Sequence, residues 1–361
     1  MGTVRVLVVE DSLTVRRRLV EVLSADPQME VVGEAGDGKT GIELCQKLRP
    51  DIVTLDMMLP TMSGLEATEY IMAYCPTPIL IVSSSTNRGE LFKTYDALAA
   101  GALDVLEKPN GHDNGVWEQI FISRVKLISH VKVITHLRAR LPNRPPNRLS
   151  TAPLPNPVVS EKVEPGVHRL VAIGASTGGP AACLQILQSL PPCYPFPILL
   201  VIHIGQAFST FFVEWLESQS PLPVAYATDG ELLPPIGQAR VLLAPPDRHL
   251  VVCNGRMRLT SDPERHSCRP SIDVLFESLA QEIGKQTIAC LLTGMGKDGA
   301  TGLLSIRQAG GRTLAQDQAT SIVFGMPQEA IRLGAAERTL GLQEFAPALL
   351  ALADNSQWRK A

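Results

Sequence analysis

Short apolar runs of strand length alternate with amphipathic segments of helix length along most of the chain. Before residue 140 the apolar runs are VRVLVV, MEVVGEA, DIVTLD, PILIVSS and DVLEKP, and each is followed by a segment of roughly 10 to 15 residues with helical periodicity. Such alternation indicates a parallel sheet covered by helices on both faces. The first part of the chain is therefore predicted to be a doubly wound α/β domain.

The same alternation returns after residue 167. The strand-like runs there are RLVAIG, PILLVIH, PVAYA, ARVLLAP and TIACLLTG. A further segment, HLVVCNGRMRLT, has the composition of a β-hairpin that turns at Asn254 and Gly255. The second part is therefore predicted to be a mostly parallel, doubly wound α/β domain that carries a hairpin.

A proline-rich segment separates the two parts. Residues 142–166 contain seven prolines, no aromatic residue and no regular apolar period, so this segment cannot bury enough apolar surface to fold. We expect a first domain over residues 1–140, an extended and semi-stiff linker over 141–166, and a second domain over 167–361. A basic stretch over residues 119–160 has seven Lys or Arg and no acidic residue; a solvated surface beside the linker is favoured there over an acidic docking partner.

The composition narrows the classes of protein that remain. Hydrophobic residues make up 45% and charged residues 19% of 361 residues, which is typical of a globular protein. No apolar run approaches the ~20 residues that span a bilayer, and the first residues do not resemble a secretory signal, so a cytoplasmic location is expected. A net charge of −3 gives no reason to expect nucleic acid. The seven cysteines form no CxxC pair and are expected to be buried thiols.

Polar residues follow several predicted strands of the first domain, where the carboxyl ends of parallel strands converge. They are Glu10 and Asp11, Asp56, Ser83 and Lys108. Three converging carboxylates favour Mg²⁺, and Asp56 is predicted to accept a phosphoryl group whose charge Lys108 offsets and whose oxygen the Ser83 hydroxyl bonds. Taken singly, these residues are more often helix caps, turn residues or solvated loop ends, but together they favour the phosphoacceptor interpretation.

The motifs VVEDS, DIVTLDMMLPTMSGLE, ILIVSSS and EKP resemble those of the response-regulator receiver family. The resemblance covers residues 1 to 135 and implies strand order 2-1-3-4-5. It implies that a histidine kinase phosphorylates Asp56, with Mg²⁺ held by Glu10, Asp11 and Asp56. It also assigns Ser83 and Lys108 as switch residues, with the neighbouring Ser84 as the alternative to Ser83.

A small-residue turn in the second domain carries a candidate nucleophile. The sequence RLVAIGASTGGP is a strand that runs into G-x-S-x-G, with Ser176 at its centre. Glycines allow a sharp strand-to-helix elbow, and the following helix N-terminus offers backbone N–H groups to an oxyanion. The alternative is a loop that cradles a phosphate.

A serine nucleophile needs a base, and the base needs an orienting acid. His203 follows the apolar run PILLVI, and Asp298 lies in LLTGMGKDGA after another predicted strand. Strand ends thus bring Ser176, His203 and Asp298 to one crevice as nucleophile, base and acid. The order Ser, His, Asp differs from that of α/β-hydrolases. Asp317 is the main competitor for the acid, and the other histidines are expected in surface or network positions.

The motifs IGASTGGP, VIHIGQAF, LAPPDRH, SCRPSIDVLF and LLTGMGKDGA resemble the catalytic domain of the chemotaxis protein-glutamate methylesterase (CheB) family. The resemblance covers residues 168 to about 353. It implies that Ser176, His203 and Asp298 are the triad. One departure is Ile204-Gly205 after the histidine, where Met-Pro is usual in the family.

The family resemblance also implies roles around the triad. The backbone at Thr177 and Met295 is expected to stabilise the oxyanion, and Arg269 and Ser271 are expected to shape the cleft or contact substrate. No cofactor is expected for the esterase reaction.

Together the two resemblances imply a receiver that controls an esterase. The expected substrate is a glutamate γ-methyl ester on the cytoplasmic helices of a chemoreceptor, with receptor glutamine as a second substrate. The receiver is expected to cover the active site until a chemotaxis-type histidine kinase phosphorylates Asp56. No nucleic acid and no membrane insertion are expected. The alternatives are hydrolysis of another acyl substrate, and a receptor-binding module without turnover.

Overall fold

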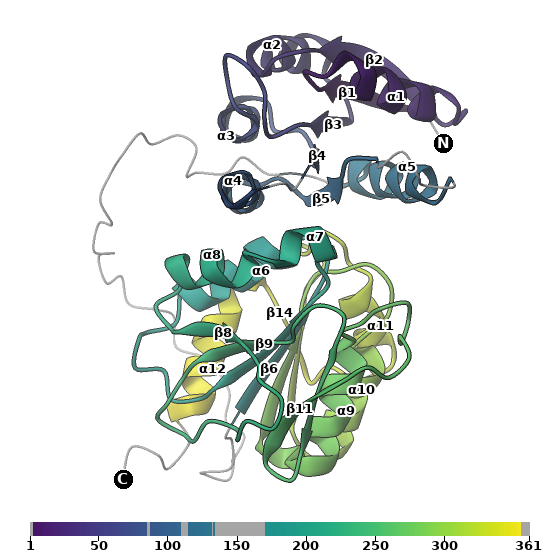
Figure 1. Cartoon of the computed structure of the whole chain (residues 1–361). Coiled ribbons are helices and arrows are strands. Elements are labelled where there is room, and N and C mark those ends of the chain that lie inside the picture. The colour runs from purple at the N-terminus through teal and green to yellow at the C-terminus, as the bar shows by residue number, and fades with distance from the viewer. Residues whose placement is uncertain (1–2, 85–86, 110–114, 132, 134–169, 355–361) are drawn as a thin grey trace.

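The computed structural model describes residues 3–84, 87–109, 115–131, 133 and 170–354. The predicted linker, residues 141–166, lies outside these residues. Within them the chain forms a five-stranded and a seven-stranded parallel sheet, each with its own helices, and a separate two-stranded hairpin (Figure 1). None of the described helices has both the length and the apolar character needed to cross a bilayer.

The first sheet has strand order β2-β1-β3-β4-β5, as predicted, with all neighbours parallel. Its strands are β1 (Val4–Val9), β2 (Met29–Ala35), β3 (Ile52–Leu55), β4 (Ile79–Ser83) and β5 (Asp104–Glu107). Its helices are α1 (Leu13–Ser24), α2 (Gly38–Leu48), α3 (Gly64–Tyr74), α4 (Arg88–Ala99) and α5 (Val116–Ser129).

Alternation along β1 explains why both faces of this sheet are covered. Val6 and Val8 pack on one face with residues of α1 and α5. Leu7 and Val9 pack on the other face with residues of α2, α3 and α4. Successive strand residues point to opposite faces, so an uninterrupted apolar strand requires helices on both sides.

The second sheet has strand order β14-β13-β12-β6-β7-β9-β8, again with all neighbours parallel. Its strands are β6 (Leu170–Ala175), β7 (Ile198–Ile202), β8 (Val224–Tyr226), β9 (Val241–Leu243), β12 (Thr287–Leu291), β13 (Arg312–Gln316) and β14 (Arg338–Leu340). The last two strands were not anticipated. Only Leu314 in β13 is a large apolar residue, so its strand character depends on its neighbours in the sheet.

Helices flank this second sheet as well. They are α6 (Gly179–Gln188), α7 (Gln206–Ser209), α8 (Phe212–Gln219), α9 (Ile272–Glu282), α10 (Ala300–Gln308), α11 (Met326–Arg332) and α12 (Phe345–Asp354), with single 3₁₀ turns at Gly284–Gln286 and Leu342–Glu344. The predicted hairpin forms β10 (His249–Cys253) and β11 (Arg256–Thr260). Asn254 and Gly255 have φ of 51° and 69°, as its tight turn requires.

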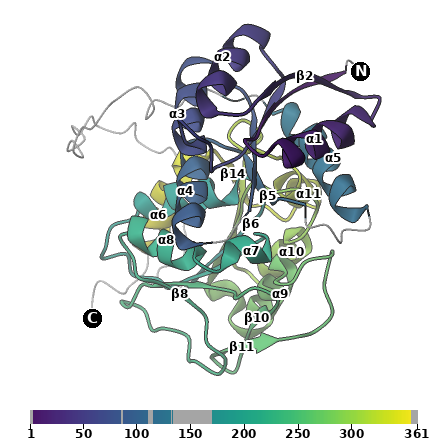
Figure 2. The same ribbon diagram turned by 45° about the horizontal axis from the view of Figure 1, so that its top comes forward.

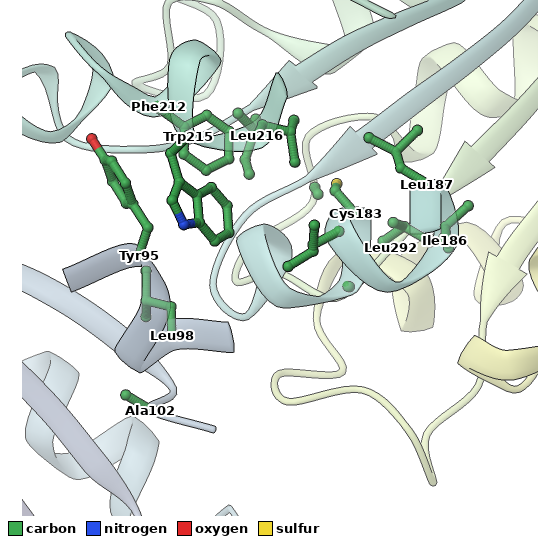
Figure 3. Packing of buried hydrophobic residues seen from close by; sticks show 14 of the residues in the cluster. Tyr95, Leu98, Ala102, Cys183, Ile186, Leu187, Phe212, Trp215, Leu216 and Leu292 are labelled. Atoms are coloured by element: carbon green, nitrogen blue, oxygen red, sulfur yellow. The ribbon is translucent and has the colours of Figure 1, made fainter. Parts of the chain in front are cut away.

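Helices of the two domains pack against each other in a way that the sequence did not predict. Helix α4 lies against α6 and α8 (Figure 2). The Tyr95 ring packs against Phe212 and Trp215, with centroid separations of 5.4 and 5.3 Å (Figure 3). The Tyr95 hydroxyl donates to the carbonyl of Phe208, and Trp215 Nε1 donates to Asp96 Oδ1 at 2.9 Å. These contacts hold the first domain over one end of the second.

Candidate functional site

Ser176 lies in the sharp turn between β6 and α6. An added Cβ at Gly174 would lie 2.3 Å from Ile272 Cγ2, so helix α9 packs directly on the backbone there. Gly178 has φ +77°, a conformation that glycine adopts without strain. Close packing therefore requires glycine at position 174, and the positive φ favours glycine at position 178. They place Ser176, which is 9% exposed, at the carboxyl end of the sheet.

His203 lies beside this turn because its strand, β7, pairs with β6. Its backbone N–H donates to the carbonyl of Ala175 at 3.0 Å, and its Nε2 lies 3.0 Å from Asp298 Oδ2. Ser176 and His203 line the same cavity of about 310 Å³. The hydrogen bonds among the described residues include none between Ser176 Oγ and the His203 ring. The structure therefore forms the histidine-to-aspartate pair and places the serine in the same cavity.

Asp298 is held at the amino end of helix α9. Its carboxylate accepts from the backbone N–H groups of Ile272 at 2.7 Å, Asp273 at 3.0 Å and Gly299 at 3.1 Å. It also accepts from Ser271 Oγ at 2.8 Å. The positive end of a helix and charge-assisted hydrogen bonds both favour a carboxylate. This side chain therefore has one orientation, with Oδ2 toward the imidazole.

These contacts shift the pKa values of Asp298 and His203 in opposite directions. Burial alone would raise the pKa of Asp298, but His203 and the backbone N–H groups of Ile272 and Asp273 outweigh it and lower that pKa. Burial alone would lower the pKa of His203, but Asp298 and then Cys268 outweigh it and raise that pKa to about 9. The arrangement therefore stabilises an imidazolium ion, which is what a general base becomes after it accepts a proton.

Thr177 and Met295, the expected oxyanion residues, flank the serine. Ser176 N–H donates to Thr293 O at 3.0 Å, which brings the 293–295 loop beside the elbow. An added Cβ at Gly294 would lie 2.7 Å from Ser176 Cβ, so only glycine permits this approach. Among the described residues, no hydrogen bond engages the backbone N–H of Thr177 or Met295. These two groups can therefore serve a ligand.

Arg269 and Ser271 lie in different surroundings. Ser271 is completely buried, caps α9 and donates to Asp298. Arg269 pairs with Asp247 Oδ1, which its Nε and Nη2 reach at 2.8 and 2.6 Å, and it lines a cavity of about 210 Å³ next to Ile202. Ser271 thus contacts the acid of the triad, whereas Arg269 stands beside the cleft.

The alternative candidates for the acid and the base of the triad have other partners. Asp317 accepts from the backbone N–H and hydroxyl of Thr320, as a turn residue does. His249 is buried in a network with Ser271 N and Pro263 O, and His266 pairs with Asp273. The structure brings none of these side chains to Ser176.

The phosphoacceptor candidates of the first domain also meet at strand ends. Glu10, Asp11 and Asp56 each offer a carboxylate oxygen within 4.8 Å of the others. Lys108 Nζ lies 2.9 Å from both Glu10 and Asp56. Ser83 Oγ is buried at the end of β4 and has no hydrogen-bond partner among the described residues. Glu10, Asp11 and Lys108 therefore lie beside Asp56, and Ser83 ends the strand that pairs with β3.

The donor set fits a hard cation such as Mg²⁺. All three ligand candidates offer oxygen, the donor that Mg²⁺ prefers. Burial, with repulsion from Asp56 second, raises the pKa of Glu10 to about 7. Carboxylates crowded in this way are expected to favour a cation bound among them.

The first domain contributes to the cavity that holds Ser176 and His203. Residues of β5 and the following loop line it, Lys108 among them, together with Arg124 of α5. Arg124 pairs with Asp104 and lies 3.4 Å from Thr177 Oγ1. Thr177 Oγ1 is also 3.5 Å from Asp104 Oδ2. The surface that covers the serine therefore includes the lysine of the phosphoacceptor site.

Cysteine exposure differs from the expectation of buried thiols. Cys45, Cys75, Cys183 and Cys290 are buried, but Cys193 and Cys253 are exposed. Cys268 is partly exposed, and its Sγ lies 3.7 Å from His203 Nδ1. Cys268 and His203 are 65 positions apart in the sequence, and no sequence pattern indicated this contact.

Comparisons with known proteins agree with this organisation. The family described as CheB methylesterase matches residues 171–349, and the family described as response regulator receiver domain matches residues 6–116. A protein-glutamate methylesterase/protein-glutamine glutaminase of Nitrosospira multiformis is 44% identical over 350 residues, covering 96% of each chain. A relative of the same name from Anaeromyxobacter dehalogenans is 42% identical, also covering 96% of each.

A solved structure is similar to the second domain. The crystal structure of the Thermotoga maritima CheB methylesterase catalytic domain is 36% identical, with a TM-score of 0.48, and covers 51% of this chain and 98% of that one. The identity to full-length relatives extends over both domains. The chain belongs to the family of CheB protein-glutamate methylesterases, with an amino-terminal response regulator receiver domain.

Proposed function

We propose that the chain hydrolyses glutamate γ-methyl esters on the cytoplasmic helices of chemoreceptors, leaving glutamate and methanol, and converts receptor glutamine to glutamate. The observation that carries this proposal is the ion pair of His203 Nε2 and Asp298 Oδ2 at 3.0 Å, with the imidazole in the cavity that Ser176 lines. The relatives' names support both activities.

In the acylation step Ser176 Oγ attacks the ester carbonyl carbon. His203 accepts the hydroxyl proton at Nδ1, because Nε2 faces Asp298. The backbone N–H groups of Thr177 and Met295 stabilise the oxyanion. His203 then returns the proton to the departing methoxide, which leaves as methanol.

In the deacylation step water takes the place of methanol. His203 removes a proton from the water, which attacks the acyl carbon, and the Ser176 oxygen departs with that proton. The same two steps with an amide substrate release ammonia. Ser271 and the start of α9 keep the Asp298 carboxylate in place throughout.

Regulation is assigned to the receiver. A histidine kinase of the chemotaxis type donates a phosphoryl group to Asp56. A Mg²⁺ ion held by Glu10, Asp11 and Asp56 would offset the charge of that group. Ser83 and Lys108 then reorganise around the phosphoryl oxygens. Because Lys108 also lines the cavity of Ser176, this rearrangement loosens the surface that covers the triad.

We further propose that residues 1–140 and 167–361 act as the two domains, joined by the linker at 141–166, in the cytoplasm. Such a linker permits the receiver to move away without leaving the chain.

Methanol release from methylated chemoreceptor tests the proposed activity. The full chain should release methanol from the receptor faster than from simple methyl esters, and Ser176→Ala should lose about 10³-fold or more of the rate. Cosedimentation of Ser176→Ala with receptor should persist. A wild-type chain that binds receptor and releases no methanol would favour a binding module, and equal rates on simple esters would favour another acyl substrate.

A further inference from the structure

We propose that Cys268 and His203 together bind a soft divalent cation, with Zn²⁺ the best fit, and that this cation blocks the general base. The site uses Cys268 Sγ and His203 Nδ1, which lie 3.7 Å apart. Binding at this site is independent of the proposed function, whereas its inhibitory effect rests on that function.

The separation of the two atoms matches tetrahedral zinc. With a Zn–S distance of about 2.3 Å and a Zn–N distance of about 2.0 Å, sulfur and nitrogen on one tetrahedral ion lie roughly 3.5 Å apart. The observed 3.7 Å needs a shift of only a few tenths of an ångström. The two side chains can therefore chelate one ion without rearrangement of the loop.

The other ring nitrogen of His203 is already oriented as in metal sites. A histidine that binds a metal usually donates its second N–H to a carboxylate, which fixes its tautomer. His203 Nε2 faces Asp298 Oδ2 at 3.0 Å. Asp298 is in turn anchored by the start of α9, so the Nδ1 lone pair is directed toward Cys268.

The loop that carries the thiol is fixed by its own backbone. Cys268 N–H donates to Arg265 O at 2.9 Å, and Arg265 N–H donates to Cys268 O at 3.2 Å. His266 and Ser267, between them, have φ of 52° and 58°. This tight turn holds Cys268 beside the ring, and its partial exposure gives an ion access.

The donor types select the class of cation. A thiolate and an imidazole suit Zn²⁺, whereas Mg²⁺ prefers oxygen donors. When the S–Zn bond forms, the Cys268 thiol releases its proton to solvent. The Nδ1 lone pair is then occupied, so His203 cannot take the proton of Ser176. Two protein ligands leave the remaining positions to water, which makes a reversible inhibitory site rather than a structural one.

Cobalt is the probe for binding. Co²⁺ added to the full chain should give the intense thiolate-to-metal charge-transfer absorption, and Zn²⁺ should abolish it by displacement. Cys268→Ser and His203→Ala should each weaken Co²⁺ binding at least about ten-fold, while Cys253→Ser, which removes an exposed thiol elsewhere, should not. The same charge-transfer band in Cys268→Ser, or none in the wild type, would overturn the proposal.

Hydrolysis of methylated receptor tests the inhibition, with Mg²⁺ held constant and the zinc-free rate of each variant as its own reference. Zn²⁺ should inhibit the wild type, a chelator should restore the rate, and Cys268→Ser should need at least about ten-fold more Zn²⁺ for the same inhibition. Equal sensitivity in Cys268→Ser would contradict the proposed site. A wild-type chain without zinc-free hydrolysis would contradict the proposed function instead, and the cobalt spectrum would still decide the site.

Discussion

Asp56 and Asp298 are buried carboxylates of the two domains with opposite surroundings. Each follows a strand of a parallel sheet, and each is about 2% exposed. Asp298 receives hydrogen bonds from three backbone N–H groups and a serine hydroxyl in addition to His203. Asp56 has Met57 N–H at 2.7 Å and Lys108 Nζ at 2.9 Å, and it stands beside the carboxylates of Glu10 and Asp11.

Because the two side chains are equally buried, their different hydrogen-bonding and charged partners, rather than burial, decide what each carboxylate can do. A carboxylate saturated with donors is fixed and can only orient and stabilise its neighbour. A carboxylate crowded by other carboxylates favours a cation, and Asp56 has fewer donors than Asp298, with Met57 N–H at Oδ1 and Lys108 Nζ at Oδ2. We therefore propose positioning for Asp298 and phosphoryl transfer for Asp56.

The largest expected effect comes from Asp298→Asn. An amide at this position cannot stabilise the imidazolium ion, and it places an NH₂ group among donors. The kcat for methyl ester hydrolysis should fall by about 10⁴-fold, as in other Ser-His-Asp enzymes. Asp317→Asn is the matched control and should stay near the wild-type rate. If the activity of Asp298→Asn stayed within ten-fold of wild type, the carboxylate of Asp298 would not be needed to stabilise the imidazolium ion.

The pH dependence sharpens the role of Asp298. His203 acts as a base only when neutral, and its pKa is raised to about 9. With EDTA present, kcat/KM should therefore rise with pH, by about 100-fold between pH 7 and the plateau above pH 9. Asp298→Asn should move this rise to lower pH, because the charge that raises the pKa is lost. A folded wild type whose kcat/KM falls between pH 7 and 9 would contradict this assignment.

Ser271→Ala removes one donor from Asp298 and leaves its charge. A hydrogen bond to a charged group contributes about 1.5 to 3 kcal/mol, so kcat should drop by roughly 10- to 100-fold if the bond is needed in the transition state. Ser305→Ala, which removes the hydroxyl of a partly exposed serine on α10 that bonds only Thr301 O among the described residues, serves as the control. If Ser271 contacts substrate instead, KM should rise while kcat and its pH profile stay unchanged.

Asp56→Ala tests the proposed role of Asp56 as the phosphoryl acceptor. The ratio of the hydrolysis rates with and without a small phosphodonor and Mg²⁺ should fall to unity, because no carboxylate remains to accept the phosphoryl group. Glu43→Ala, which removes an exposed carboxylate of the same domain, should retain the wild-type ratio. Equal stimulation of Asp56→Ala and wild type would rule out Asp56 as the acceptor.

The smallest expected effect comes from a substitution where the first domain contacts Thr177, next to Ser176. Arg124→Ala removes the contacts of α5 with Asp104 and Thr177. The contact that crosses to the second domain is the hydrogen bond from Arg124 to Thr177 Oγ1. A bond of this kind contributes about 1 kcal/mol, so unstimulated hydrolysis should rise by a few-fold. Lys126→Ala on the same helix loses contacts only within the receiver and should not raise it. A folded Arg124→Ala chain without this rise would show that the contact does not restrain the triad.

The sequence predicted the parts of the site that depend on strand order. Ser176, His203 and Asp56 follow strands whose apolar runs are visible, and parallel sheets bring such ends together. Ser271 was expected near substrate, yet its hydroxyl faces Asp298, which is 27 positions away. That contact depends on how α9 packs, and no local pattern encodes it.

The contact of Tyr95 with Trp215 and the strand β13 could not be predicted from local sequence patterns either. Tyr95 and Trp215 have the ordinary spacing of buried helix residues, and only the docking of the two domains makes them partners. Strand β13 has too few large apolar residues to stand out, because β12 and β14 supply its neighbours. Tertiary context decides both.

In the proposed mechanism His203, oriented by Asp298, activates Ser176. Reaction of the phosphodonor-treated full chain with a fluorophosphonate, followed by peptide mass spectrometry, tests it most directly. We expect a single adduct on Ser176 that His203→Ala fails to form. Labelling of a different serine, or equal labelling of Ser176 in His203→Ala, would show that His203 does not activate Ser176.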